Sequence, residues 1–344
     1  MNESRALDAV GPLGWLSSGI GYHLDNLGCW LLENAPVLGI AYAGLLKPRA
    51  PGLQPRPGWT FAAEYYDQRQ WLACRRGALW EAARRKGLII PLVVSWHEGS
   101  RIEVTLGNDN SLCLYVCGSF EPNEFAFLDR VLKPGMVFVD VGANDGYFAT
   151  FAARKVGDGG RVVAVEPSSR ERAHLSRNLT LNSISNVTVL PIALGTSPGV
   201  VELKLADGLH TGHNTLGDFA HEDVVSASSE RVEMRTLDGA VEHLGLSRVD
   251  VIKIDVEGGE GGVIAGGSGV ISKWRPVLLL EVNDRALRVQ GYSADLLLAK
   301  LQSEFGYEIL VWAKGGGAPT RWQAGEPMSE NIVAVPRERL SELA

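Results

Sequence analysis

Acidic side chains stand at the ends of several apolar stretches of this sequence, where chemistry is usually placed in α/β proteins. The clearest stretch is Val249–Val256, in which Lys253, Asp255 and the following Glu257 alternate along the chain and therefore share one face. Glu281 ends a second apolar stretch, Val277–Asn283. Three charges in a buried strand are costly unless they are paired or functional. We expect a functional cluster here, with a purely structural salt-bridge network as the alternative.

A second group of residues lies in the turn that follows Val137–Val141. That apolar run is typical of a strand buried on both faces of a parallel sheet, and Tyr147–Lys155 is typical of a helix. A strand, a glycine turn and a helix open many nucleotide-binding sheets. The turn and the strand end predict five cofactor-binding residues: Asp140, Gly142, Ala143, Asn144 and Gly146.

The residues of this turn also indicate which nucleotide is bound. Asn144 stands where a dinucleotide fingerprint needs its second glycine, and Asp140 would repel a pyrophosphate. A carboxylate at that place favours a ligand with an ammonium and a sulfonium, and S-adenosylmethionine has both. Glu166 follows Gly142 by 24 positions, a spacing that suits a carboxylate on ribose hydroxyls. The structural alternatives are a helix-capping carboxylate for Asp140 and a loop-facing charge for Glu166.

Transfer of the methyl group of such a ligand to an acceptor would also need a group that removes the acceptor's proton. His210 and His213 lie in the polar loop 207–229, and the ordinary histidine pKa of about 6.5 suits a base near neutrality. A solvated loop histidine is the alternative. Asp255 is the leading candidate for substrate orientation or proton removal, followed by Glu257, Glu281 and His213. The alternative is that the three carboxylates hold a divalent cation, but we predict no metal site.

Composition limits the classes of protein to consider. A chain of 344 residues suggests two regions, which we place at 1–110, an accessory region of unknown role, and 111–344, the cofactor-binding domain. The net charge of −7 argues against nonspecific nucleic-acid binding. Four scattered cysteines and an acidic amino terminus without a secretory leader indicate a cytoplasmic protein.

The early uncharged stretches, 9–24 and 35–46, are shorter than the roughly 20 apolar residues of a membrane span. We therefore expect no integral membrane segment, with peripheral membrane contact as an alternative. The sequence leaves open whether the protein forms a homo-oligomer.

Residues 1–110 are expected to be mainly helical, with a helix from Thr60 to Lys86 that stops at Gly87. Three strands are expected after it: Leu88–Trp96, Arg101–Leu106 and Leu112–Cys117. Cys113 and Cys117 would then share one strand face, as buried thiols rather than a metal pair, because no second pair at zinc spacing accompanies them.

The remaining pattern alternates strands and helices and predicts a doubly wound, mostly parallel sheet. The further helices are expected at Glu121–Leu132, Ser168–Leu181 and Asp238–Leu244, and the further strands at Val187–Ala193, Val200–Leu205, Arg231–Leu237, Tyr307–Trp312 and Asn331–Pro336. The last two strands form a closing antiparallel pair.

The spaced motifs together resemble the FkbM family of methyltransferases over about residues 115–335. They are Phe120–Pro122, Asp140–Gly146, Glu166–Pro167, Asn178–Asn182, Ala193–Gly195, Thr236–Asp238, Ile252–Gly258 and Glu281–Val282. The resemblance implies a class I methyltransferase fold, S-adenosylmethionine as methyl donor, and a hydroxyl of a sugar, glycoside or polyketide-type natural product as acceptor. It also implies that Pro167, Asn182 and Ala193 border the cofactor. Asp145 and the glycines at 259, 261 and 262 depart from the family pattern.

Three other functions are weighed against an O-directed methyltransferase. A nicotinamide-dependent oxidoreductase on a similar sheet is disfavoured by Asn144 and Asp140. A catalytically silent S-adenosylmethionine-binding module would keep the fold without turnover, against which Asp140, Glu166 and Asp255 argue. An RNA methyltransferase is disfavoured by the acidic balance and the lack of a dense basic stripe.

Overall fold

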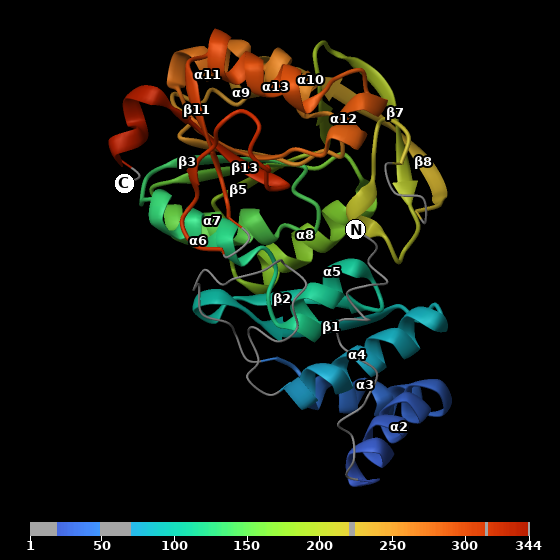
Figure 1. Ribbon diagram of the computed structural model, residues 1–344. Coiled ribbons are helices and arrows are strands. Elements are labelled where there is room, and N and C mark those ends of the chain that lie inside the picture. Colours follow the sequence, from blue (N-terminus) through green and yellow to red (C-terminus); the bar gives the residue numbers. More distant parts are fainter. Residues whose placement is uncertain (1–18, 49–69, 220–223, 314–315, 343–344) are drawn as a thin grey trace. The chain divides into compact units, whose positions relative to one another are not determined.

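The computed structural model describes residues 19–48, 70–219, 224–313 and 316–342 (Figure 1). The chain divides into two compact units. Unit 1 comprises Met1–Pro122 together with the loop segment Gly208–Thr211, and unit 2 comprises Asn123–Asp207 and Gly212–Ala344.

Unit 1 consists of helices and one hairpin. The helices are α2 (Gly19–Asn34), α3 (Pro36–Leu45), α4 (Gln70–Arg85) and the single turn α5 (Asp109–Ser111). Strands β1 (Ile90–Ser95) and β2 (Arg101–Leu106) lie where the sequence predicts strands, and they pair antiparallel. The helix predicted from Thr60 is seen from Gln70 onward, and its expected start lies outside the described residues. Gly87, at φ +60°, follows its last turn.

The strand predicted at Leu112–Cys117 is wrong, because this segment is a π-helix, η2. A short apolar run cannot be distinguished from a buried helix by its pattern alone. The side chain of Asn108 accepts a hydrogen bond from Ser111 N just before it, which favours a helical start. Cys113 and Cys117 are indeed buried free thiols, and burial raises the pKa of Cys117 to about 12.

Unit 2 is built on an eight-stranded sheet with the order β12-β11-β13-β10-β9-β3-β4-β5. Strands β3, β4, β5, β9 and β10 run parallel, and β13 lies antiparallel between β10 and β11. This is the class I methyltransferase arrangement, so the predicted fold and its closing antiparallel pair are confirmed. The bounds are β3 Val137–Val141, β4 Arg161–Val165, β5 Val187–Leu190, β9 Val251–Ile254, β10 Val277–Glu281, β11 Tyr307–Val311, β12 Thr320–Arg321 and β13 Asn331–Pro336.

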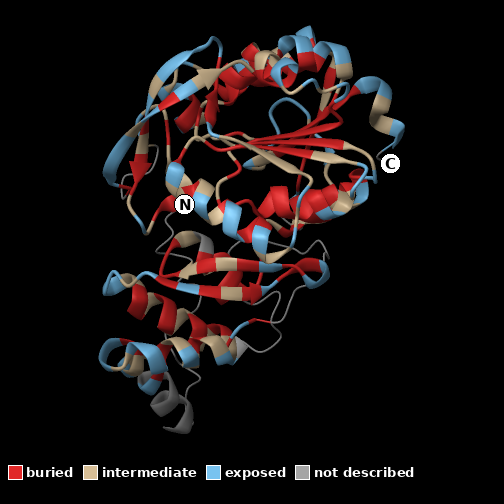
Figure 2. Cartoon of the chain, turned by 180° about the vertical axis from the view of Figure 1, so that it is seen from behind, coloured by how far each residue is buried: buried red, intermediate tan, exposed pale blue. Residues whose placement is uncertain are grey.

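Helices cover both faces of this sheet (Figure 1). One face carries α6 (Pro122–Val131), α7 (Tyr147–Val156) and α8 (Ser169–Leu181). The other carries α9 (Leu237–His243), α10 (Glu260–Gly266), α11 (Ser268–Trp274), α12 (Asp284–Val289) and α13 (Ala294–Ala299), the last continued by the π-helix η4 (Lys300–Glu304). Figure 2 shows most of the strands between the two layers buried, whereas β5 is of intermediate burial and β12 is exposed. The near-continuous apolar strands follow from this coverage.

A second sheet of three strands has the order β6-β8-β7, with β6 Ile192–Leu194, β7 Gly199–Ala206 and β8 Ser226–Arg235. The single strand predicted at Val187–Ala193 is therefore wrong in its extent. Pro191 interrupts it, and because proline has no N–H to donate, β5 ends in the large sheet and β6 starts in the small one. Strand β8 also begins before Arg231, within the segment predicted as loop.

Among the residues that the structure describes, no helix has the length and apolar character that crossing a membrane requires.

Candidate functional site

Asp140 lies on the central strand β3, next to Lys253 of β9 in the parallel register. Its side chain is 0% exposed, and neither carboxylate oxygen has a hydrogen-bond partner of ordinary geometry. Burial raises the pKa of Asp140 to about 6, Lys253 and the backbone of Ala149 oppose this rise, and Asp255 adds to it. A buried carboxylate without hydrogen bonds is costly in a folded protein, which points to a polar ligand.

The glycine turn after β3 brings the two predicted groups of residues together. Gly142 has φ +79°, and a Cβ atom on it would lie 1.8 Å from the carbonyl oxygen of Asp255. Gly146 also has φ +79°, and its Cβ would meet Leu175 of α8 at 2.8 Å. Ala143 is buried, and its N–H donates to Val165 O (3.0 Å). Only glycine allows the turn to approach the end of β9 so closely.

Glu166, at the end of β4, is buried rather than loop-facing. Its Oε2 accepts a hydrogen bond from Asn144 N (2.8 Å), and its Oε1 accepts one from Ser168 N (2.8 Å). Burial raises the pKa of Glu166 to about 8, against these two hydrogen bonds. Each carboxylate oxygen has a second lone pair, so a ribose hydroxyl can still bind there. Pro167 follows directly, and its carbonyl accepts from Arg172 Nη1 (2.5 Å).

Two further predicted cofactor residues lie at a helix end and in the small sheet. Asn182 caps the carboxyl end of α8, the end away from Glu166, and its amide donates to Asn178 O (2.7 Å). The 13 residues of α8 span about 20 Å. Ala193 lies in β6 of the small sheet, in an apolar cluster with Leu203 and Leu205. The resemblance implies that both residues border the cofactor, and this stays a prediction.

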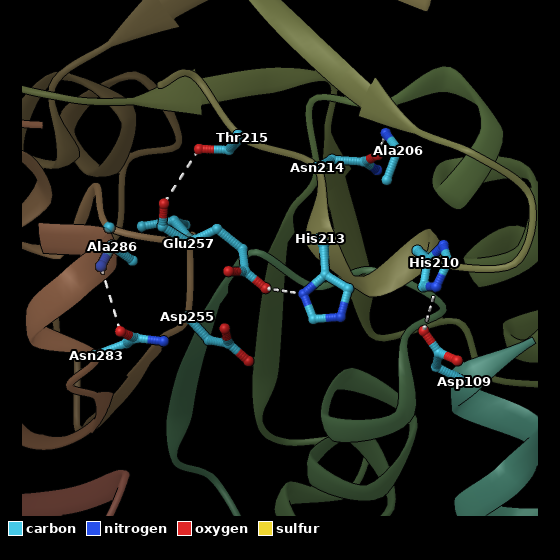
Figure 3. A network of polar contacts seen from close by, with 12 residues as sticks. Asp109, Ala206, His210, His213, Asn214, Thr215, Asp255, Glu257, Asn283 and Ala286 are labelled. Atoms are coloured by element: carbon cyan, nitrogen blue, oxygen red, sulfur yellow. Dashed lines mark hydrogen bonds and ion pairs between the residues drawn. The ribbon is translucent and has the colours of Figure 1, made fainter. Parts of the chain in front are cut away.

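Three of the predicted catalytic residues, Asp255, Glu257 and His213, gather beyond the carboxyl end of β9 (Figure 3), and Glu281 is hydrogen-bonded with Asp255. Lys253 Nζ lies 2.8 Å from Asp255 Oδ2 and 4.6 Å from the ring centroid of Phe148. Burial disfavours the charged form of Asp255 and would raise its pKa. The charge of Lys253, hydrogen bonds with Lys253 and Glu281, and the nearby His213 outweigh this effect, so the pKa of Asp255 is lowered. Burial, together with the charges of Asp255 and Glu257, raises the pKa of Glu281 well above its usual range. These shifts favour the ionised form of Asp255 and the protonated form of Glu281.

His213 and Glu257 form a separate pair, with Nδ1 of His213 3.0 Å from Oε1 of Glu257 (Figure 3). Glu257 has φ +52°, and its backbone carbonyl accepts hydrogen bonds from Thr215 Oγ1 (3.1 Å) and Gln290 Nε2 (2.9 Å). The carboxylate is therefore held on a fixed backbone. His210 does not join this pair, because its ring lies 2.9 Å from Arg84 in unit 1.

Two buried acids near this site were not predicted. Glu124 of α6 accepts a hydrogen bond from Asn331 Nδ2 (3.2 Å), and burial raises its pKa to about 7. Glu260 accepts hydrogen bonds from Val256 N (3.0 Å) and Gly258 N (3.2 Å), and burial raises its pKa to about 7. Glu260 shapes the turn that carries Glu257. The signal available in the sequence was Glu260 itself, an acidic residue at the start of a helix whose other residues are small or apolar.

The departures from the family pattern have local explanations. Asp145 is buried, its Oδ2 accepts from Tyr147 OH (3.2 Å), and its carbonyl accepts from Asn178 Nδ2 (2.8 Å). Gly261 packs against Tyr292, whose ring would lie 2.3 Å from an added Cβ. Asp145 thus ties the turn to α8, and the glycine-rich start of α10 admits a tyrosine ring. In the part of the chain that the structure describes, no three His, Cys, Asp or Glu side chains could hold a metal ion.

Comparison with known proteins shows what this chain is similar to. The profile of the methyltransferase FkbM domain matches residues 140–309. The chain is 31% identical over 213 residues to the AMB antimetabolite synthetase AmbE of Pseudomonas aeruginosa, covering 53% of this chain and 10% of that protein. It is 31% identical over 154 residues to the methyltransferase sdnD of Sordaria araneosa, covering 37% and 59%. It is 26% identical over 167 residues to the 2-O-methyltransferase NoeI of Sinorhizobium fredii, covering 45% and 66%.

The chain thus spans between a tenth and about two thirds of these relatives' lengths. Among solved structures, it is similar to the methyltransferase FkbM of Methylobacillus flagellatus, with 18% identity, a TM-score of 0.36, and coverage of 65% of this chain and 52% of that one. It is also similar to SMU.1697c of Streptococcus mutans, a methyltransferase solved in complex with SAH, with 9% identity, a TM-score of 0.37, and coverage of 62% and 94%.

Proposed function

Because the chain belongs, through residues 140–309, to the FkbM methyltransferase family, we propose that it transfers the methyl group of S-adenosylmethionine to a hydroxyl of a sugar, glycoside or polyketide-type natural product. The observation that carries the choice of donor is Asp140, a fully buried carboxylate without a hydrogen-bond partner of ordinary geometry, at the glycine turn after β3. A cationic ligand at that place would compensate the cost of burying its charge.

The residues present fit this donor. Asp140 and the Gly142 turn would hold its methionine and ribose end, Asn144 and Gly146 shape the turn, and Glu166 would accept its ribose hydroxyls. When bound, S-adenosylmethionine supplies a methyl group made electrophilic by the sulfonium. The protein must then hold the acceptor oxygen in line and remove its proton, and a positioned base contributes roughly 10²–10⁴-fold to the rate.

His213 is the base that the geometry favours over Asp255. Asp255 is already paired with Lys253, and its lowered pKa makes it a weak proton acceptor. His213 faces Glu257 through Nδ1, so Nε2 is the nitrogen that would take the hydroxyl proton, and Glu257 would stabilise the imidazolium that forms. Asp255 and Glu281 are then left to orient acceptor hydroxyls.

The test is an acceptor screen with purified protein and S-adenosylmethionine. Methyl glycosides and their deoxy and amino analogues are offered in parallel, and product mass and S-adenosylhomocysteine formation are measured. His213→Gln should lower the rate on a hydroxyl acceptor by about 10²–10⁴-fold. His243→Gln, an exposed residue at the end of α9, is the matched control and should leave the rate unchanged.

Each of three results would overturn part of the proposal. Methylation of the amino analogues alone would exclude a hydroxyl acceptor, and full activity of His213→Gln would exclude the base. Cofactor binding without methylation of any acceptor would identify a silent binding module instead.

A further inference from the structure

Lys253 of β9 is a buried lysine in the middle of the site, and the proposed function leaves it without a role. Its side chain is 6% exposed, and its Nζ lies 2.8 Å from Asp255 Oδ2. Lysine is almost never buried to this extent unless its charge is paired. The side chain of Asp255 is 32% exposed. The ion pair therefore has its basic end in the core and its acidic end open to a ligand.

The same lysine lies beside the aspartate that is proposed to bind the methyl donor. Asp140 of β3 and Lys253 of β9 are partners in the parallel register. Partner positions of neighbouring strands lie about 4.8 Å apart, and their side chains point to the same side of the sheet. Neither oxygen of the fully buried Asp140 has a hydrogen-bond partner of ordinary geometry. The ammonium of Lys253 is the neighbouring positive charge that opposes the cost of burying this carboxylate.

Aromatic rings fix the place of this ammonium. Lys253 Nζ lies 4.6 Å from the ring centroid of Phe148 in α7. The ring of Phe148 stacks on Phe125 of α6, with the centroids 4.3 Å apart, and Phe125 meets Phe151 edge to face. A cation over the face of a desolvated ring is attracted by the ring quadrupole. The packed rings therefore hold the ammonium beside the two aspartates.

The other titratable groups around the Lys253–Asp255 pair come from several elements of unit 2. They are Asp140 of β3, Glu124 of α6, Glu281 of β10, Glu260 of α10 and His213 of the polar loop. Four of these five groups are acids. The charge of Lys253 lowers the pKa of Asp140, Asp255 and Glu124. Loss of the ammonium would therefore make these three carboxyl groups harder to ionise.

We propose that Lys253 is a positioning residue shared by the two halves of the site: its ammonium holds the carboxylate of Asp255 toward the acceptor and compensates the buried charge of Asp140 until the methyl donor binds. The relevance of Lys253 to catalysis rests on the proposed function, in which Asp140 binds the donor and Asp255 orients acceptor hydroxyls. The contacts that carry the inference all lie within unit 2.

The test follows both aspartates by carbon NMR of the full chain, with isotope-labelled aspartate carboxyl groups and no ligand. The two resonances are assigned by their loss in Asp140→Asn and Asp255→Asn. In the wild type, Asp140 should titrate near pH 6 and Asp255 below the ordinary 3.8. In Lys253→Met both midpoints should rise, that of Asp140 by about 1–3 pH units, because an adjacent opposite charge shifts a carboxyl pKa by that amount.

Two further variants separate the charge of Lys253 from its packing. Lys253→Arg keeps the positive charge and should keep the midpoint of Asp140 near pH 6. Lys155→Met is the matched control, because Lys155 is also paired with a carboxylate, that of Asp129, and also lies over a ring, that of Phe151 (5.6 Å). Lys155 stands in the last turn of α7, away from the glycine turn, so its replacement should move neither midpoint.

A second variant covers the case in which Lys253→Met does not fold. Asp255→Asn leaves the ammonium to Asp140 and removes a negative neighbour, so the midpoint of Asp140 should fall below that of the wild type. An Asp140 midpoint that is unchanged in a folded Lys253→Met protein, or in Asp255→Asn, would overturn the shared role of Lys253.

Calorimetric titration with S-adenosylmethionine at pH 7 then tests the link to the donor. Lys253→Met should bind about 2- to 100-fold more weakly than the wild type, because a midpoint about 1–3 units higher leaves correspondingly less ionised Asp140. Equal affinity of the two proteins despite shifted midpoints would overturn the donor half of the inference. Shifted midpoints in a wild type that does not bind S-adenosylmethionine would instead overturn the proposed function and leave the pairing of Lys253 with both aspartates established.

Discussion

Replacing Asp140 by Asn should stabilise the protein without ligand while removing its donor site. The carboxylate is fully buried with neither oxygen hydrogen-bonded in ordinary geometry, and its pKa of about 6 lies above the 3.8 of an unburied aspartate. The folded state therefore prefers the protonated acid. Its stability is unaffected by this group below about pH 3.8 and decreases as the pH rises through 6.

The size of the effect follows from the two pKa values. They differ by about 2 units, and each unit corresponds to about 1.4 kcal/mol, so ionised Asp140 costs the ligand-free protein about 3 kcal/mol at pH 8. Asparagine carries no charge and avoids this cost. The variant should equal the wild type near pH 4 and gain up to about 3 kcal/mol in free energy of unfolding at pH 8.

The assay is urea unfolding followed by circular dichroism at pH 4, 6 and 8, with Asp250→Asn as the control. Asp250 is also buried, but its carboxylate accepts from Val137 N (2.8 Å) and pairs with Arg248. Its replacement should therefore destabilise the protein by about 1–3 kcal/mol, the opposite sign. An Asp140→Asn protein that is less stable than the wild type at pH 8 would refute the reasoning.

Further predictions concern the turn, the pH and a helix cap. Gly142→Ala should cost about 2–5 kcal/mol in unfolding free energy, because the added Cβ would lie 1.8 Å from Asp255 O at a positive φ. The control Gly159→Ala should be nearly neutral, because its Cβ would meet nothing within 4 Å. Equal effects of the two variants in thermal unfolding would contradict the close approach at Gly142. The dissociation constant for S-adenosylmethionine should rise about tenfold for each pH unit below the Asp140 pKa of about 6, because the carboxylate becomes protonated there. A dissociation constant that calorimetry finds unchanged from pH 5 to 8 would rule this out. Thr236→Ala should cost about 1 kcal/mol, because Thr236 Oγ1 accepts from Gly239 N at the start of α9 (3.0 Å), and an unchanged urea midpoint would count against the cap.

Much of the fold followed from local pattern. Buried parallel strands have near-continuous apolar sequences, so Val137–Val141 and Val277–Asn283 were recognisable, and Gly142 marked the turn between β3 and α7. Short apolar runs carry less information. Leu112–Cys117 forms a π-helix because tertiary packing, with the whole segment buried, decides its conformation.

The site was predictable in its residues but not in their pairing. Alternation placed Lys253 and Asp255 on one face, and they form an ion pair. Nothing local indicates that His213 meets Glu257, 44 residues away, while His210 joins Arg84 in the other unit. The partners of the two histidines depend on the three-dimensional path of a long loop.

The most direct test of the account is calorimetric titration of S-adenosylmethionine into the full chain at pH 8, with wild type and Asp140→Asn compared. The account predicts micromolar binding to the wild type and loss of that binding in a variant that is folded and more stable than the wild type. Equal affinity for both proteins, or no binding to a folded wild type, would contradict the assignment of Asp140 to the methyl donor.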